Sequence, residues 1–272
     1  MEYLKRFNSF FVGLASKIPK RQRFILTTFI LTILLVVLTF FSLSEIIYFV
    51  PLVIVIVYFG TYFSLLEGIT KAEWAVLFIS PVFFTIVFLF FYYFLPQRWL
   101  TRLPFAILYS IALYAILLSQ NIFNVGVEKS LQLARAAFSV NYLFVTITFF
   151  MSSSILFSLG LPFYQNVFWM ALVSFLLNLQ FLWTIEPKEY VEKILLHYGL
   201  FMSIVIGEVS LILSFLPLST AISALAITGV FYGFGGLLQS HLQERLFKEK
   251  IREYSIVLLF IAAIVLLTLR WN

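Results

Sequence analysis

Nine long apolar runs, separated by short polar segments, dominate this 272-residue chain. Each run is close to the roughly 20 apolar residues that a helix needs to cross a hydrocarbon core about 30 Å thick. Membrane-spanning strands would alternate apolar and polar residues, and these runs do not. The pattern predicts an all-α integral membrane bundle of about nine transmembrane helices. The runs cover approximately residues 24–42, 46–66, 74–95, 104–124, 138–158, 164–184, 194–216, 219–237 and 255–271.

The distribution of the eighteen Lys and Arg residues predicts which side of the membrane the N-terminus occupies. When the N-terminus is placed in the cytoplasm, only Arg98, Arg102 and Arg270 fall on the outer side. Polytopic helical proteins keep an excess of Lys and Arg in their cytoplasmic connections, so the asymmetry predicts a cytoplasmic N-terminus. The net charge of +6 then belongs mainly to the inner face. There it fits anionic lipid headgroups, and nucleic acid is not a predicted partner.

The nine runs leave no room for a separate soluble domain, so residues 24–272 are expected to form a single transmembrane helical domain. Residues 1–23 precede it as a cytoplasmic amphipathic and basic segment. Apolar residues between Tyr3 and Ile18 recur at steps of three and four, which is typical of a helix lying in the headgroup plane. Such a helix would act as a topogenic anchor or, alternatively, as a protein-docking helix.

Local residue pairs mark helix ends and inner connections. Ser42–Glu45 and Thr70–Glu73 match the capping box, and Lys188 and Glu192 have the i,i+4 spacing of a helical ion pair. Residues 125–138 are polar but follow a helical pattern, so they form either an interfacial helix or part of a long, tilted span five. Residues 238–254 predict that span eight continues into the cytoplasm as an amphipathic helix.

Glu208 is the most informative single residue, because it lies within the seventh apolar run. A carboxylate near the bilayer centre costs about 2.5–3.5 kcal/mol on insertion scales and is a functional candidate that normally faces the bundle interior. The alternative is a structural hydrogen bond to a neighbouring helix. Tyr232 in span eight is a candidate partner. Gly233, with Gly229, forms a small-residue face that predicts either close helix packing or a hinge.

A second polar group lies at the inner ends of spans four and five. The side chains that could line an inner-facing cavity are those of Gln120, Asn121, Asn124, Arg135 and Asn141. The alternative is that amides near an interface simply bind water or headgroups.

The sequence lacks the residues that several kinds of metal-binding and catalytic site require. The chain contains no cysteine, which excludes disulfides and thiolate metal sites. It contains no aspartate, and it has neither a His-Glu-x-x-His nor a Gly-x-Ser-x-Gly motif. A phosphate-binding glycine loop is also absent. We therefore predict no catalytic residues, no metal and no cofactor.

Three segments together resemble a family of uncharacterised polytopic membrane proteins from bacteria. They are Ser119–Val125, Leu131–Ala137 and Gly236–Leu246. The resemblance implies a multi-pass protein of the bacterial cytoplasmic membrane, and it implies no established activity.

Two classes of function follow. In the first, the protein is permease-like or an accessory transport subunit, with Glu208 as a titratable group and the glycine segment of span eight as a mobile wall. In the second, it is a non-catalytic membrane scaffold or assembly factor that docks a membrane protein partner through its cytoplasmic amphipathic helices. A lipid-modifying enzyme is a more distant third. The intramembrane carboxylate favours the transport-type role.

Overall fold

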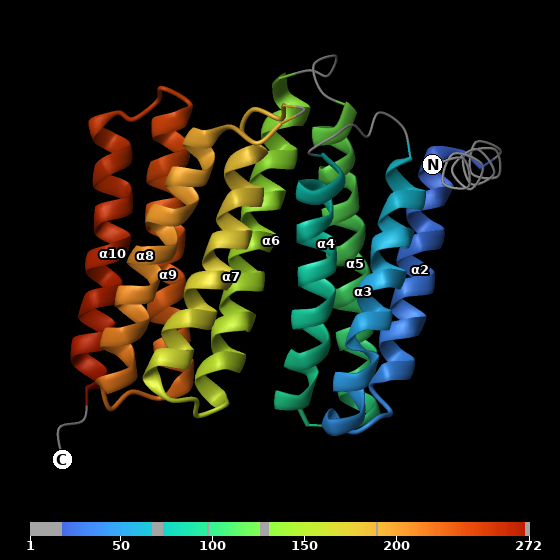
Figure 1. The fold of residues 1–272 in the computed structure, drawn as a ribbon, viewed down its shortest axis with the longest axis horizontal. Coiled ribbons are helices and arrows are strands. Elements are labelled where there is room, and N and C mark those ends of the chain that lie inside the picture. The colour runs from blue at the N-terminus through green and yellow to red at the C-terminus, as the bar shows by residue number, and fades with distance from the viewer. Residues whose placement is uncertain (1–17, 67–72, 97, 126–130, 189, 270–272) are drawn as a thin grey trace. The chain divides into compact units, whose positions relative to one another are not determined.

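The computed structural model describes residues 18–66, 73–96, 98–125, 131–188 and 190–269. Within these ranges the chain forms nine α-helices, a short 3-10 helix η1 (Tyr92–Phe94) and no strand (Figure 1). All nine α-helices are long and apolar enough to cross a membrane, which confirms the predicted all-α, multi-pass architecture for this part of the chain. Their bounds are α2 Lys20–Leu38, α3 Leu43–Leu65, α4 Glu73–Phe91, α5 Trp99–Val125, α6 Leu131–Ser158, α7 Phe163–Trp183, α8 Lys193–Phe215, α9 Thr220–Leu242 and α10 Lys248–Thr268.

The chain divides into two compact units, residues 1–144 and 145–272, and α6 contributes to both. Residues 2–17 of the predicted amphipathic helix, which runs to Ile18, lie outside the described residues, as does Thr70 of the second capping box. The continuous helix α6 begins at Leu131, so the polar residues from there to 138 belong to a long fifth span. Residues 126–130 lie outside the description.

In the first unit, α2, α3 and α5 pack against one another, and α4 packs on α3 and α5. The α2–α3 contact is close because Gly60 has no side chain: a Cβ there would lie 3.1 Å from Thr27 Cγ2. The predicted capping box at the start of α3 is confirmed, since the Ser42 N–H and Oγ both donate to Glu45 Oε2, at 2.8 and 2.9 Å. It satisfies a backbone donor that the first turn would otherwise leave unpaired.

In the second unit, α8 packs between α7 and α9, and α10 packs on α9. Small residues let α7 and α8 approach. Ser203 Oγ donates to the Ala171 carbonyl at 2.8 Å, and a Cβ at Gly207 would lie 3.5 Å from Val167 Cγ1. The predicted Lys188–Glu192 pair closes the turn before α8, at 2.5 Å, and Lys188 also contacts Glu186 at 3.3 Å. These two carboxylates raise the pKa of Lys188.

The prediction that span eight continues as a cytoplasmic helix through residue 254 is wrong. Helix α9 ends at Leu242, and Glu244 adopts a left-handed conformation with φ of 53°. The Arg245 N–H then donates to the Ser240 carbonyl at 2.8 Å, and the Glu244 N–H donates to the His241 carbonyl at 3.0 Å. This pair of bonds is the Schellman arrangement, which turns the chain out of the helix and into α10.

Candidate functional site

Glu208 lies in the C-terminal half of α8, seven residues before the helix ends at Phe215. At 1.5 Å per residue it is therefore about 10 Å from the C-terminal end of the helix. The structure does not place it in the interior of the second unit as expected, because its side chain is exposed. No hydrogen bond or ion pair joins it to any described residue.

Glu208 stands in the middle of an exposed stripe that runs the length of α8. The neighbouring stripe residues are large and apolar: Ile204 is 60% exposed, Ile212 59% and Phe215 68%. In a membrane-spanning helix these apolar side chains can simply face lipid, so they carry no functional information by themselves. The carboxylate among them does, because lipid offers it neither a hydrogen bond nor a counter-charge.

Packing on the other side of α8 explains this orientation. Gly199, Ser203, Gly207 and Ser210 recur at steps of four and three and lie toward the interior of the unit. Gly199 and Gly207 contact α7, and Met202 and Ile206 between them are fully buried. Each residue turns a helix by about 100°, so Glu208, one step after Gly207, points away from this packed face.

Tyr232 and Gly233 do not join Glu208. Tyr232 is 37% exposed, and its ring lies 5.9 Å from the ring of Tyr254 in α10. A Cβ at Gly233 would lie 3.0 Å from Leu258 Cδ2, so this glycine packs against α10. Of the two predictions for the glycine face, close packing and a hinge, the structure shows close packing. Gly229, Gly233 and Gly236 all lie against side chains of α10.

The structure brings part of the predicted polar group together in the first unit. Gln120 Nε2 donates to Asn141 Oδ1 at 3.0 Å, and this bond joins α5 to α6. Both side chains are buried, as is Asn124 one turn further along α5. Asn121 is half-buried, whereas Arg135 is exposed and has no place in this group. The group is a buried interhelical contact, and Arg135 does not extend it.

Sequence reasoning missed polar residues buried in the same unit. Arg23 is only 2% exposed, although its position in a basic run suggested a surface charge. One turn later, Thr27 accepts a 2.8 Å hydrogen bond from Ser64 Oγ of α3. The signal was present in the spacing, because Arg23, Thr27, Leu31 and Leu35 recur every four residues on the buried face of α2.

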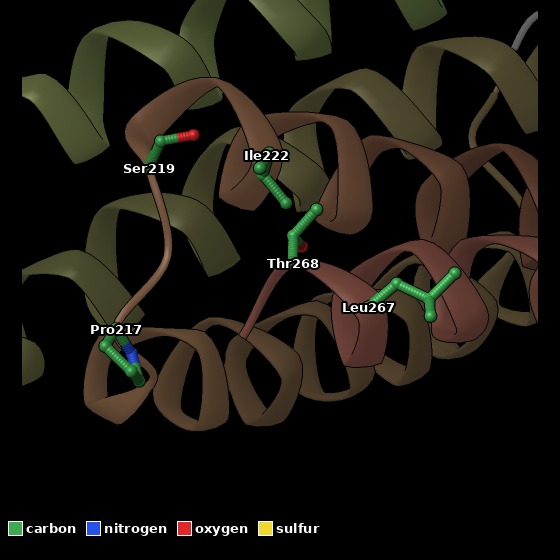
Figure 2. Close-up of a pocket in the computed structure, with 5 residues that line it drawn as sticks. All are labelled: Pro217, Ser219, Ile222, Leu267 and Thr268. Atoms are coloured by element: carbon green, nitrogen blue, oxygen red, sulfur yellow. The ribbon is translucent and has the colours of Figure 1, made fainter. Parts of the chain in front are cut away.

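A hollow of about 530 Å³ lies in the second unit, between the α8–α9 turn and the last turn of α10 (Figure 2). Its lining residues are Pro217, Ser219, Ile222, Leu267 and Thr268. None of these five side chains is titratable, so they offer a ligand two hydroxyl groups and apolar contact.

The profile of a family described as a protein of unknown function, DUF5656, matches residues 105–268. This match covers more than half of the chain. The chain belongs to the DUF5656 family. Its predicted resemblance to an uncharacterised family is thereby confirmed. No curated protein and no solved structure matches the chain.

The DUF5656 match begins near the start of α5 and ends with α10. It includes the exposed face of α8 and the Gln120–Asn141 pair. Helices α2, α3 and α4 precede it, so the buried Arg23 lies outside the matched residues. The protein is thus a multi-pass membrane protein of a family whose description names no activity.

The Gln120–Asn141 bond gives a testable expectation for stability. We expect Gln120→Leu and Asn141→Leu each to destabilise the protein, because each removes one partner of a buried hydrogen bond. We expect the double variant to cost less than the sum, with a coupling of about 0.5–2 kcal/mol. Thermal unfolding of the three variants in detergent measures this coupling. Additive effects would show that the bond contributes nothing specific.

Proposed function

We propose that this DUF5656 protein is a non-catalytic accessory subunit of a membrane complex and that it docks a partner membrane protein through the exposed face of α8. A single observation carries the proposal: an exposed carboxylate, Glu208, in the middle of an otherwise apolar transmembrane face. The location we propose is the bacterial cytoplasmic membrane, where the basic connections would contact anionic headgroups.

The energetic argument depends on what covers Glu208. Facing lipid costs an ionised carboxylate about 2.5–3.5 kcal/mol or more. A protein partner that supplies a hydrogen-bond donor removes much of this penalty. It also replaces lipid along the stripe with packed side chains, and such packing drives helix association within membranes. Glu208 is therefore more stable against a protein partner than in permanent contact with lipid.

The same geometry separates this proposal from its alternatives. A permease with Glu208 as an interior titratable group needs that carboxylate among other polar side chains, and Glu208, Tyr232 and Gly233 do not converge. A role as accessory subunit of a transporter needs only the docking face and is retained. Docking through a cytoplasmic helix over residues 238–254 has no support, because the chain turns at Glu244.

Photocrosslinking in the native membrane tests the proposal. A benzoyl-phenylalanine probe at Ile204 or Leu211, on either side of Glu208, is expected to give a discrete protein adduct. Matched probes at Leu259 and Leu266 on α10, which are 70% and 69% exposed, serve as lipid-facing controls. If Ile204 and Leu211 label only lipid, as the controls are expected to do, the α8 face is not a docking surface.

A further inference from the structure

We infer that the partner helix seated on α8 carries a cationic side chain, Lys or Arg, at the depth of Glu208. This inference rests on the proposed docking function and specifies the chemistry of its partner. Three observations support it: the separation of Glu208 from the described cations of its own unit, the like charge that a second copy would bring, and the place of the carboxylate along the helix.

Among the described residues of the second unit, every Lys and Arg lies at the inner side. They are Lys188, Lys193, Arg245, Lys248, Lys250 and Arg252. Lys193, at the start of the same helix, is fifteen residues from Glu208. That separation corresponds to about 22 Å, beyond the reach of a lysine side chain. No described cation of this unit therefore reaches Glu208, and the partner supplies the counter-charge.

A second copy of the chain is a poor occupant of this face. A two-fold interface presents the same surface on both subunits, so it would bring one Glu208 toward the other. Two carboxylates in a medium of low dielectric constant repel each other unless they share a proton. A partner with a cation relieves the cost of the exposed charge, whereas a second copy doubles the number of charges.

The depth of Glu208 also specifies where the partner cation should lie. It is about 10 Å from the outer end of α8, and the exposed residues around it, Ile204, Leu211 and Ile212, offer no polar group. A Lys or Arg side chain that enters the membrane from the outer boundary can bury its stem along these residues and place its charge at the carboxylate. The expected partner thus has a basic residue in the outer half of a transmembrane helix.

Substitutions at Glu208, read out by the α8 crosslink, test the inference. Glu208→Gln and Glu208→Lys are expected to reduce the adduct at Leu211 by roughly tenfold or more, because each removes the charge pair. Glu208→Asp keeps the charge and should retain more of the adduct. Glu249→Gln, which neutralises an exposed carboxylate in the first turn of α10, is the matched control and should change nothing.

Two further measurements separate the possible outcomes. The crosslinked partner helix should contain a Lys or Arg whose replacement by Glu restores the adduct to Glu208→Lys. In native membranes, dicyclohexylcarbodiimide, a lipid-soluble reagent for carboxyl groups, should label Glu208 only after the partner has been removed. An adduct unchanged in Glu208→Gln, with labelling in the intact membrane, would overturn the charge pair while leaving the docking function in place. An adduct to a second copy would also overturn it, and the lack of any protein adduct would overturn the docking function itself.

Discussion

Gly229→Leu is expected to detach α10 from α9. The two helices meet along a ridge of glycines on α9, where Gly229 faces Ile261, Gly233 faces Leu258 and Gly236 faces Tyr254. A Cβ at residue 229 would lie 2.9 Å from Ile261 Cγ1 and would overlap the terminal methyl group. Overpacking of this kind typically costs about 1–3 kcal/mol. The effect should be large because α10 has no buried residue and packs mainly on this ridge.

A disulfide across the ridge measures this displacement. A Cβ at residue 233 would lie 3.1 Å from Leu258 Cγ, so cysteines at positions 233 and 258 should form a disulfide in a chain that has no other cysteine. Adding Gly229→Leu should slow its formation on the order of tenfold. Ala221→Leu, which adds the same side chain at an exposed position of α9, is the control. Equal rates in the two variants would show that the glycine at 229 is not needed for docking.

The approximate positions of the described helices could be predicted because their signal is strong, although α6 begins at Leu131 and α10 at Lys248, each seven residues before the predicted run. Twenty apolar residues between polar connections have one stable form in a membrane, since every backbone group must be bonded within the helix. The ends were also readable where a local pair defines them, as at Ser42 and Glu45 or at Lys188 and Glu192. The end of α9 could not be predicted from the sequence. Its left-handed residue is Glu244, and the sequence there lacks the glycine that commonly marks such a turn.

The rotation of each helix about its axis was much harder to predict. In a soluble protein, polar residues mark the outer face, but a transmembrane helix is apolar on both its lipid-facing and its packed side. The general expectation that an intramembrane carboxylate faces inward therefore placed Glu208 on the wrong side of α8. The spacing of Gly199, Ser203, Gly207 and Ser210 carried the better information, because small residues mark the packed face of a membrane helix.

Basic residues near helix ends show a second limit of sequence reasoning. Arg23 and Arg102 both contributed to the predicted topology as if their charges faced water or headgroups. The structure buries Arg23 on the packed face of α2 and surrounds Arg102 with specific partners. A count of charges therefore predicts a direction of threading, but it does not distinguish a solvated cation from one that holds helices together.

Arg102 joins three segments of the first unit: η1, the α2–α3 turn and the first turn of α5. Its Nε donates to the buried Tyr92 hydroxyl of η1 at 2.9 Å, and its guanidinium also donates to the Thr39 carbonyl after α2, at 3.2 Å. The same group lies 4.1 Å from the centre of the Phe40 ring, which is a cation–π contact. One side chain at the start of α5 thus fixes the α2–α3 turn and the end of the third span.

Arg102→Leu is accordingly expected to destabilise the protein by about 3 kcal/mol, because hydrogen bonds to charged groups contribute about 1.5–3 kcal/mol each and the Tyr92 hydroxyl would remain buried without this donor. Arg102→Lys should recover less than half of the loss, since one ammonium group cannot reproduce the planar fork that reaches both acceptors. Thermal unfolding in detergent, followed by tryptophan fluorescence, measures both variants. Arg98→Leu removes an exposed arginine from the same connection and is the control. If Arg98→Leu and Arg102→Leu lowered the unfolding temperature equally, the contribution would come from net charge at the outer face rather than from the contacts of Arg102.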